Sequence, residues 1–319
     1  MRGLTIKGLR FGWRGVVAVE TGARVAFDRE LWRALKGWLP YATVEVLQTR
    51  RRDIIPVRGL PNMPAPYYLL WGVLRRAGLR AAKDAELSLL FTDQTVVEDF
   101  PHARGRWVLN GDCRDISKSR VAEVFEEVFG YALGVDPETH VGPIVRKSEV
   151  NGDHSGEIVE GPCAREAGWV YQRAVDNAAD GFVADLRCPT VFGEVPIVCI
   201  KRREVERRFD NYNAACDLAE PEDIFSVEEI AKISEFCRAM RLDWGGLDIL
   251  RDAGDGRIYI VDVNKTDMPV LVLSTREKLE VSRRLAKALR DGVEARLRGA
   301  SGAARERRPQ ARQGEKARA

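Results

Sequence analysis

A predicted hairpin near the C-terminal end constrains the fold of this chain more than any other feature. Residues 246–250 and 257–263 alternate apolar and polar side chains, and they flank the segment Asp252-Ala253-Gly254-Asp255-Gly256. A short Asp- and Gly-rich segment between two alternating stretches is typical of a turn between antiparallel strands. We therefore expect the two stretches to pair, which places the acidic side chains of both strands next to one another.

The predicted hairpin carries three side chains with oxygen donors. Asp262 and Asn264 are two residues apart on the second strand, so both face the same side, and Asp248 on the first strand can meet them across the hairpin. Carboxylate and amide oxygens suit a hard cation such as Mg²⁺. A solvated edge with alternating polar and apolar residues explains the same pattern equally well.

The rest of the chain alternates predicted strands and helices, which indicates an α/β (α+β) architecture. The expected strands span residues 15–20, 43–47, 86–91, 107–109, 143–147, 156–160, 169–175, 182–191 and 194–201. The expected helices span residues 28–38, 67–77, 115–131, 226–240 and 276–298. Ser226, with Glu229 three residues later, predicts a capping box for the fourth helix.

Charge and composition limit the classes of protein and divide the chain. The net charge is +3, but the six basic and two acidic residues of 299–319 give that segment +4, which leaves −1 for the rest. Apart from this tail, nucleic-acid binding is therefore not expected. No apolar run approaches the roughly 20 residues that cross a bilayer, and no secretory signal is visible, so no membrane association is expected.

The six cysteines are scattered and contain no Cys-x-x-Cys pair, so we expect reduced thiols in a cytoplasmic protein. The tail is too polar to bury a core of its own, so we predict that it is disordered. We expect an N-terminal α/β domain over residues 1–106, a second domain over 107–298 and the basic tail over 299–319.

Basic residues on predicted strands precede the hairpin. Lys147 ends one strand, and the glycine-containing residues 151–156 after it are able to cradle phosphate, although an ordinary Gly-Asp turn is the alternative. Arg187, Lys201 and Arg203 lie on two adjacent strands at spacings that put them on one face. Opposite the hairpin carboxylates they would neutralise phosphate charge, whereas a solvated basic strand is the alternative.

The order of these pieces resembles the ATP-grasp superfamily. The resemblance rests, in chain order, on Lys118, Lys147 with its glycine turn, YQRAVD (171–176), DLR (185–187), KRR (201–203), Asn211, Asp248 and DVN (262–264). DLRCPTVFGEVPIVCIKRR and LDWGGLDILRD with IVDVN look closest to the branch that holds glutathione synthetases and ribosomal-protein glutamate ligases. The resemblance covers about residues 107–270, and it implies an ATP-grasp fold preceded by the small α/β domain.

The resemblance implies three groups of site residues. Those that would bind ATP, through its phosphates, adenine and ribose, are Lys118, Lys147, Gln172, Arg173, Val175 and Asp176. Those that would act on the γ-phosphate and an acyl phosphate are Arg187, Lys201 and Arg203. The ligands of two Mg²⁺ ions, with Mn²⁺ as an alternative metal, would be Asp248, Asp262 and Asn264.

The activity that the resemblance implies is an ATP- and Mg²⁺-dependent ligase. Such an enzyme activates a carboxylate as an acyl phosphate, which an amine then attacks to give an amide or peptide-like bond. Small-molecule or peptide carboxylates and amines would be the substrates, and related ligases are often homo-oligomers. Two alternatives remain, which are an ATP-grasp kinase acting on a small-molecule hydroxyl and a non-catalytic ATP-binding scaffold protein.

Three departures from the family pattern concern the metal and the second substrate. Asp262 stands where a metal-binding glutamate is usual, which shortens the side chain by one methylene and keeps the charge. Residues 265–269 replace the small residues and Pro-Gly turn that often border the acceptor in amide ligases. Asp210 stands where an arginine is expected, and Arg208 would take over its role. The sequence therefore leaves the acceptor undefined.

Overall fold

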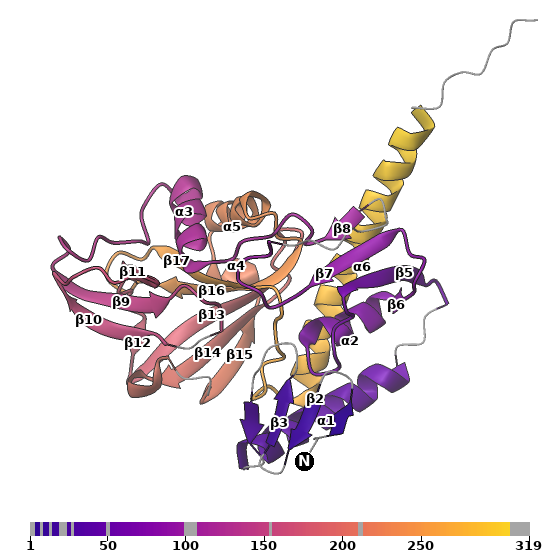
Figure 1. Ribbon diagram of the computed structural model, residues 1–319, viewed down its shortest axis with the longest axis horizontal. Coiled ribbons are helices and arrows are strands. Elements are labelled where there is room, and N and C mark those ends of the chain that lie inside the picture. Colours follow the sequence, from indigo (N-terminus) through magenta and orange to yellow (C-terminus); the bar gives the residue numbers. More distant parts are fainter. Residues whose placement is uncertain are drawn as a thin grey trace, which may run out of the picture.

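The computed structural model describes residues 4–6, 9–12, 15–18, 24–26, 29–48, 52–98, 107–152, 155–209 and 213–306. These residues form four sheets and the helices that pack on them (Figure 1). The mixed α/β architecture expected from the sequence is confirmed. Among the helices in these ranges, none is both long and apolar enough to cross a membrane.

The largest sheet contains the predicted hairpin and is antiparallel. Its strands are β12 (Ala178–Ala179), β13 (Phe182–Val191), β14 (Val198–Glu204), β15 (Ala215–Ala219), β16 (Trp244–Arg251) and β17 (Ile258–Asn264). They follow the order β15-β14-β13-β16-β17, with β12 beside β13. The register pairs Asp248 with Asp262 and Arg187 with Asp248, so these three side chains form one row across three strands.

A smaller antiparallel sheet lies beside the largest one, at the left of Figure 1. It consists of β9 (Gly142–Ser148), β10 (Glu157–Gly161) and β11 (Trp169–Arg173), with β9 in the middle. Helices α3 (Lys118–Phe129) and α5 (Val227–Ala239) cover one face of the largest sheet, and the short helices η1 (Val205–Arg207) and α4 (Pro221–Ile224) lie in its connections. Phe125, Phe236 and Leu247 are fully buried in the core between helices and sheet.

A parallel sheet stands at the other end of the molecule. Its strands are β5 (Ile55–Pro61), β6 (Leu79–Ala81), β7 (Leu87–Phe91) and β8 (Trp107–Leu109), in the order β6-β5-β7-β8. Helix α2 (Leu69–Ala77) packs against the long helix α6 (Thr275–Glu306). A second core joins this sheet to the largest one, because Leu70, Leu89, Trp244 and Leu289 belong to a single buried cluster.

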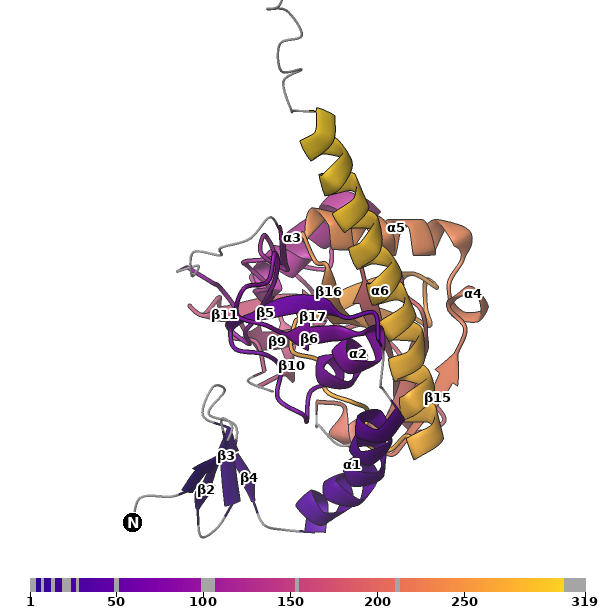
Figure 2. The same cartoon turned by 90° about the vertical axis from the view of Figure 1, so that its right-hand side faces the viewer.

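The strand expected over residues 43–47 is wrong, because this segment is the end of helix α1 (Arg29–Gln48). The β-branched Thr43, Val44 and Val46 favour a strand locally. Packing decides otherwise, since Tyr41 and Glu45, four residues apart on one helix face, are both fully buried. Ahead of α1, an antiparallel sheet of β1 (Leu4–Ile6), β2 (Leu9–Gly12), β3 (Gly15–Ala18) and β4 (Arg24–Ala26) stands apart from the other sheets (Figure 2).

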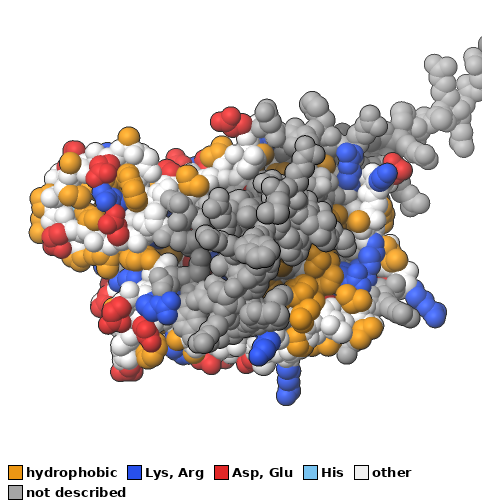
Figure 3. All heavy atoms as spheres, turned by 60° about the horizontal axis from the view of Figure 1, so that its bottom comes forward, with side chains coloured by type: hydrophobic (Ala, Val, Ile, Leu, Met, Phe, Trp, Pro, Cys, Tyr) orange, Lys and Arg blue, Asp and Glu red, His pale blue; other side chains and the backbone are white. Residues whose placement is uncertain are grey.

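Helix α6 continues eight residues beyond the end expected at residue 298, to Glu306. Residues 307–319, the rest of the expected tail, lie outside the described residues. On the face shown in Figure 3, most of the Asp and Glu side chains gather at the left, Lys and Arg side chains occur on both sides, and hydrophobic side chains reach the surface between them. This mixture agrees with the near-neutral charge of the chain outside its tail.

Candidate active site

Charged side chains of opposite sign meet on one face of the largest sheet. The Asp248 carboxylate lies 2.9 Å from Nη1 of Arg187 and, through its other oxygen, 2.9 Å from Nζ of Lys201. The Asp262 carboxylate pairs with the ammonium group of Lys118 at the start of α3. Each acidic group is therefore neutralised from a neighbouring element, and five of the expected site residues lie together.

Burial and the charged neighbours act in opposite directions on this cluster. Burial raises the pKa of the Asp248 carboxyl, but Arg187 and Lys201 outweigh it and hold the pKa well below its usual range. Burial lowers the pKa of the Arg187 guanidinium, whereas the carboxylates of Asp248 and Asp267 raise it above its usual value. Both groups therefore stay charged and provide a local field that acts on an anionic ligand.

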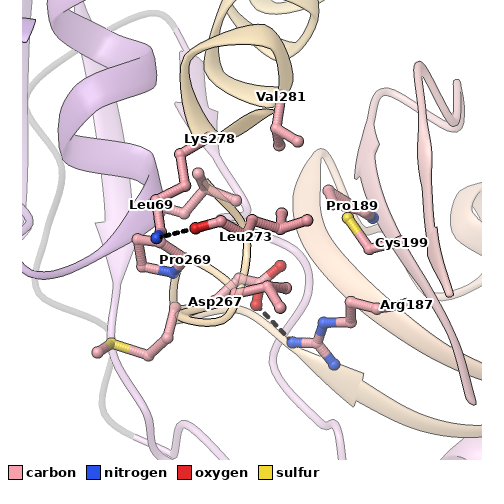
Figure 4. Close-up of a pocket in the computed structure, with 11 residues that line it drawn as sticks. Leu69, Arg187, Pro189, Cys199, Asp267, Pro269, Leu273, Lys278 and Val281 are labelled. Atoms are coloured by element: carbon pink, nitrogen blue, oxygen red, sulfur yellow. Dashed lines mark hydrogen bonds and ion pairs between the residues drawn. The ribbon is translucent and has the colours of Figure 1, made fainter. Parts of the chain in front are cut away.

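Arg187 also contacts the loop that follows the hairpin. Its Nη2 lies 2.7 Å from Oδ1 of Asp267, and both side chains are buried. Figure 4 shows this pair in the wall of a small pocket, most of whose other side chains are apolar. The backbone beside the pair has no room for a side chain, since a Cβ on Gly246 would lie 2.8 Å from Cζ of Arg187. The guanidinium is thus held from three sides.

Lys147 on the smaller sheet faces the same charges. Burial, helped by the charge of Lys118, lowers the pKa of its ammonium group to about 8, although the charges of Asp262 and Asp248 raise it. These influences decline with distance, so Lys147 lies near the carboxylates of the largest sheet. The charges of the two sheets therefore act on one another.

The buried amide of Gln172 lies on the same face of the smaller sheet as Lys147. Gln172 on β11 pairs with Val145, which is two residues before Lys147 on β9, so the three side chains point the same way. Gln172 is 1% exposed, and neither its amide nitrogen nor its amide oxygen has a partner within the described ranges. An unsatisfied buried polar group costs about 1–3 kcal/mol. A ligand edge with a donor beside an acceptor, such as a purine, would satisfy both atoms.

The segment after β9, expected to cradle phosphate, is anchored at the start of α3. Oδ1 of Asn151 accepts a hydrogen bond from Nζ of Lys118 at 3.3 Å, and the Asn151 N–H donates to Oγ1 of Thr95 at 2.8 Å. Glu149 accepts from the backbone N–H and the hydroxyl of the second residue of α3. Residues 153–154, in the middle of this segment, lie outside the described residues. The segment therefore lies beside one of the two lysines expected to bind phosphate.

The residues after Gln172 contact other parts of the protein, and their expected role in nucleotide binding stays a prediction. The Arg173 side chain points to the hairpin turn, 3.4 Å from the carboxylate of Asp255. Val175 is buried, and its carbonyl oxygen accepts from Arg208 at 3.4 Å. Asp176 is exposed, and its carboxylate accepts the backbone N–H of Ala178 at 3.3 Å.

Arg203 lies two residues beyond Lys201 on the same face of β14, and its charge also lowers the pKa of Asp248. It pairs with Asp185 on β13, whose carboxylate also accepts a hydrogen bond from Nδ2 of Asn177 at 3.2 Å. Arg208 donates to the other end of the same amide, Oδ1 of Asn177, at 3.0 Å. Residues 210–212, which include Asp210 and Asn211, lie outside the described ranges. A role for Arg203 at the γ-phosphate stays a prediction.

The donor set on the hairpin fits Mg²⁺ when a nucleotide supplies further ligands. Asp248 and Asp262 are cross-strand neighbours, and Asn264 lies two residues further on the same face. In the described part of the chain, no group of three His, Cys, Asp or Glu residues is placed to hold a metal. The protein thus offers two carboxylates, whereas the Asn264 amide oxygen already accepts hydrogen bonds from the backbone N–H and the hydroxyl of Thr266, at 2.8 and 3.2 Å, and would have to exchange them to bind a metal. Mg²⁺ is commonly held by one or two carboxylates together with phosphate oxygens.

Sequence reasoning missed two buried carboxylates near the site. Asp267 pairs with Arg187, and Asp252 was assigned only to a turn, yet each is 4% exposed. The sequence contained one sign of the buried Asp267: two charged residues, Lys265 and Asp267, closely follow Asn264, where related ligases have small residues. A charge in such an apolar setting is normally paired, which would have predicted a partner for Asp267.

Comparison with known proteins identifies the fold. No protein-family model and no curated protein sequence matches this chain. Among solved structures, the ATP-grasp ligase PsnB complexed with minimal precursor is similar with a TM-score of 0.50 and 14% identity, over 74% of this chain and 99% of PsnB. The D-alanine–D-alanine ligase from Bacillus anthracis complexed with ATP gives a TM-score of 0.46 and 12% identity, over 78% and 99%. The likeness to PsnB shows that this chain has the ATP-grasp fold.

Proposed function

We propose that this chain is an ATP- and Mg²⁺-dependent ligase that activates a carboxylate as an acyl phosphate and joins it to an amine. The observation that carries the proposal is the row of charges, in which Asp248 and Asp262 lie in register and face basic groups from four other elements. Those basic residues are Lys118, Lys147, Arg187 and Lys201. Two acidic metal ligands opposite four cations meet the needs of phosphoryl transfer, and the ATP-grasp fold supports this reading.

Each basic residue would have a role that follows from its position in the site. Lys147, beside the unpaired amide of Gln172, would bind phosphate while that amide reads the base. Lys118 would leave the Asp262 carboxylate and contact a phosphate oxygen instead, because its ammonium group is a point charge on a flexible side chain. Arg187 is fixed by two carboxylates, so its charge is preorganised for the negative charge that develops on the transferred phosphoryl group.

Asp248, Asp262 and Asn264 would hold the metal. Bound Mg²⁺ supplies positive charge that offsets the repulsion between the γ-phosphate and an attacking carboxylate. Arg187 and Lys201 keep Asp248 ionised, so this ligand needs no deprotonation before it binds a cation.

The proposed reaction needs no nucleophile from the protein. A substrate carboxylate oxygen attacks the γ-phosphorus of ATP, and the bond to the ADP oxygen breaks. The amine then attacks the acyl carbon, phosphate leaves with the bonding electrons, and the amine loses a proton. The products are the amide, ADP and inorganic phosphate in equal amounts.

The experiment that tests the proposal measures ADP and inorganic phosphate while carboxylates and amines are varied with Mg²⁺ and ATP. Amino acids and short peptides, each with and without a second amine, form the first panel. We expect equal release of ADP and phosphate only when both substrates are present, and no release from Asp248→Asn. The control Asp217→Asn, an exposed carboxylate on β15, should match the wild type.

Other outcomes would replace the proposal with one of its competitors. ADP formed with a phosphorylated product and without free phosphate would indicate a kinase. ATP binding by calorimetry without turnover on any pair of the panel would favour a non-catalytic ATP-binding protein. Absence of ATP binding would contradict every reading that places a nucleotide between the two sheets.

A further inference from the structure

The turn between β16 and β17 is docked on the segment that leaves the smaller sheet. The backbone N–H of Asp176 donates to Oδ2 of Asp252 at 3.3 Å, and the N–H of Ala253 donates to the carbonyl oxygen of Asp176 at 2.7 Å. Arg173 adds ion pairs, 3.7 Å to Asp252 and 3.4 Å to Asp255. The turn thus binds both the backbone N–H and the backbone carbonyl oxygen of Asp176.

Asp252 satisfies more groups than a turn requires. Its Oδ1 accepts the backbone N–H groups of Gly254 and Asp255 at 2.8 and 3.2 Å, which is the local pattern of an Asp-initiated turn. Its Oδ2 is left over for the N–H of Asp176, and the side chain is buried. Burial raises the pKa of this carboxyl, but the three backbone N–H groups lower it below its usual value, so the charge persists in the contact.

One hairpin therefore holds both ends of the proposed nucleotide site. Its strands carry Asp248 and Asp262, which face the phosphate-binding lysines, and its turn carries Asp252. The segment that Asp252 holds contains Asp176 and directly follows Gln172, whose unpaired amide faces the site. A rigid hairpin that contacts both places fixes the distance between the base and ribose end and the metal and phosphate end.

Building on the proposed function, we infer that Asp252 is a positioning residue for the nucleotide. It touches neither substrate nor metal ligand, and it acts by fixing the backbone of residues 173–176 against the hairpin. Loss of this contact weakens ATP binding, because the segment must then be ordered when the ligand arrives. The rate of the chemical step changes little, since the row of charges around Asp248 remains intact.

The test compares Asp252→Asn with the wild type in two measurements on the full chain. Asn has a single amide oxygen, so it cannot accept the two N–H groups of the turn and the Asp176 N–H from both of its ends as the carboxylate does, and we expect hydrogen exchange of residues 173–178 to accelerate about tenfold or more in protein without added nucleotide. We expect the Kd for ATP, measured by calorimetry, to rise about tenfold, with kcat changed less than about twofold. Asp180→Asn removes an equal charge from an exposed turn nearby and should alter neither measurement.

A second variant covers the case in which Asp252→Asn unfolds. Ala253→Pro removes the other hydrogen bond to Asp176 without a change in charge, and it should reproduce both effects. Unchanged hydrogen exchange in residues 173–178 would overturn the contact. Faster exchange with an unchanged Kd would overturn the positioning role while the contact stands. If the wild type binds no ATP, both the proposed function and the positioning role fail. The hydrogen-exchange comparison needs no nucleotide, so it still shows whether the contact between Asp252 and Asp176 exists.

Discussion

Each acidic residue of the proposed site has a basic partner within the protein. Asp248 contacts Arg187 and Lys201, and Asp262 contacts Lys118. A charge that is buried without a partner costs several kcal/mol, so these pairs make a folded site with so many charges possible. When Mg²⁺ and phosphate bind, the acidic residues would exchange a basic side chain for the metal, and the basic residues would exchange a carboxylate for phosphate. No charged side chain would then have to be buried without a partner.

The first prediction at the residue scale concerns the second strand of the hairpin. The double variant Asp262→Ala with Asn264→Ala should lose Mg·ATP-dependent release of ADP, because two of the three expected oxygen donors disappear. Both side chains are half-buried at the site and outside the apolar cores, so the circular dichroism spectrum should stay unchanged. The exposed Asp217→Ala on β15 serves as control. Turnover that survives in the double variant would show the metal assignment to be wrong.

The second prediction concerns pH and Lys147. Its pKa of about 8 means that the ammonium form, which binds phosphate, is lost as the pH rises through 8. Because bound phosphate favours the charged form, the Kd for ATP should increase about tenfold between pH 7 and pH 9. Lys147→Arg keeps its charge throughout this range and should show a much flatter profile. An equally steep profile in both proteins would contradict the role of Lys147.

What the sequence can predict of this site depends on how far apart the partners lie along the chain. Asp248 and Asp262 belong to one hairpin that the sequence predicts, but the register from the turn alone would pair Asp248 with Val261. A register shift between Asp248 and Ile249 brings Asp262 opposite Asp248 instead, and the local pattern does not predict it. Lys118 against Asp262 joins residues 144 positions apart, and only the packing of α3 on β17 brings them together. The Arg187–Asp267 pair is likewise tertiary, and local pattern gives no indication of its geometry.

At the scale of the element, helix α5 begins at a signal in the local sequence, whereas helix α1 depends on a contact with a distant part of the chain. The start of α5 is encoded locally, since the hydroxyl of Ser226 accepts from the Glu229 N–H and the Glu229 carboxylate accepts from the Ser226 N–H. The end of α1 depends on a distant partner, because the buried Glu45 forms an ion pair with Arg76 of α2. A window of sequence around residue 45 therefore cannot show why this segment is helical.

The contact between α1 and α2 gives a prediction for packing. A Cβ on Gly72 would lie 2.1 Å from Oη of Tyr41, whose ring is fully buried. Gly72→Ala should therefore push α1 away and lower the free energy of unfolding by about 1–3 kcal/mol, although alanine favours helix. Urea unfolding measures the change. Gly134→Ala, whose Cβ would meet nothing closer than 4.0 Å, is the matched control, and equal effects in both variants would contradict the packing account.

At the scale of the whole molecule, the second core contains residues from both sides of the boundary expected at residue 106. The second core contains Leu89 of the parallel sheet, Trp244 of the largest sheet and Leu289 of helix α6, all fully buried. Helix α6 comes from the C-terminal end of the chain and packs on α2 near the other end. Removal of either part would expose the apolar face of the other.

We therefore expect the N-terminal α/β part and the ATP-grasp part to unfold together. Differential scanning calorimetry should give one transition, and Leu289→Ala, which empties a fully buried site, should shift the whole transition to lower temperature by removing about 2–5 kcal/mol of stability. Phe236→Ala, in the core between α5 and the largest sheet, should shift the same single transition. Two resolved transitions, each moved by only one of these variants, would show instead that the parts fold independently. A shared transition would mean that destabilising the parallel sheet also loosens the charged site, because the backbone N–H of Leu69 at the start of α2 donates a hydrogen bond to the carbonyl oxygen of Asp267 at 3.0 Å.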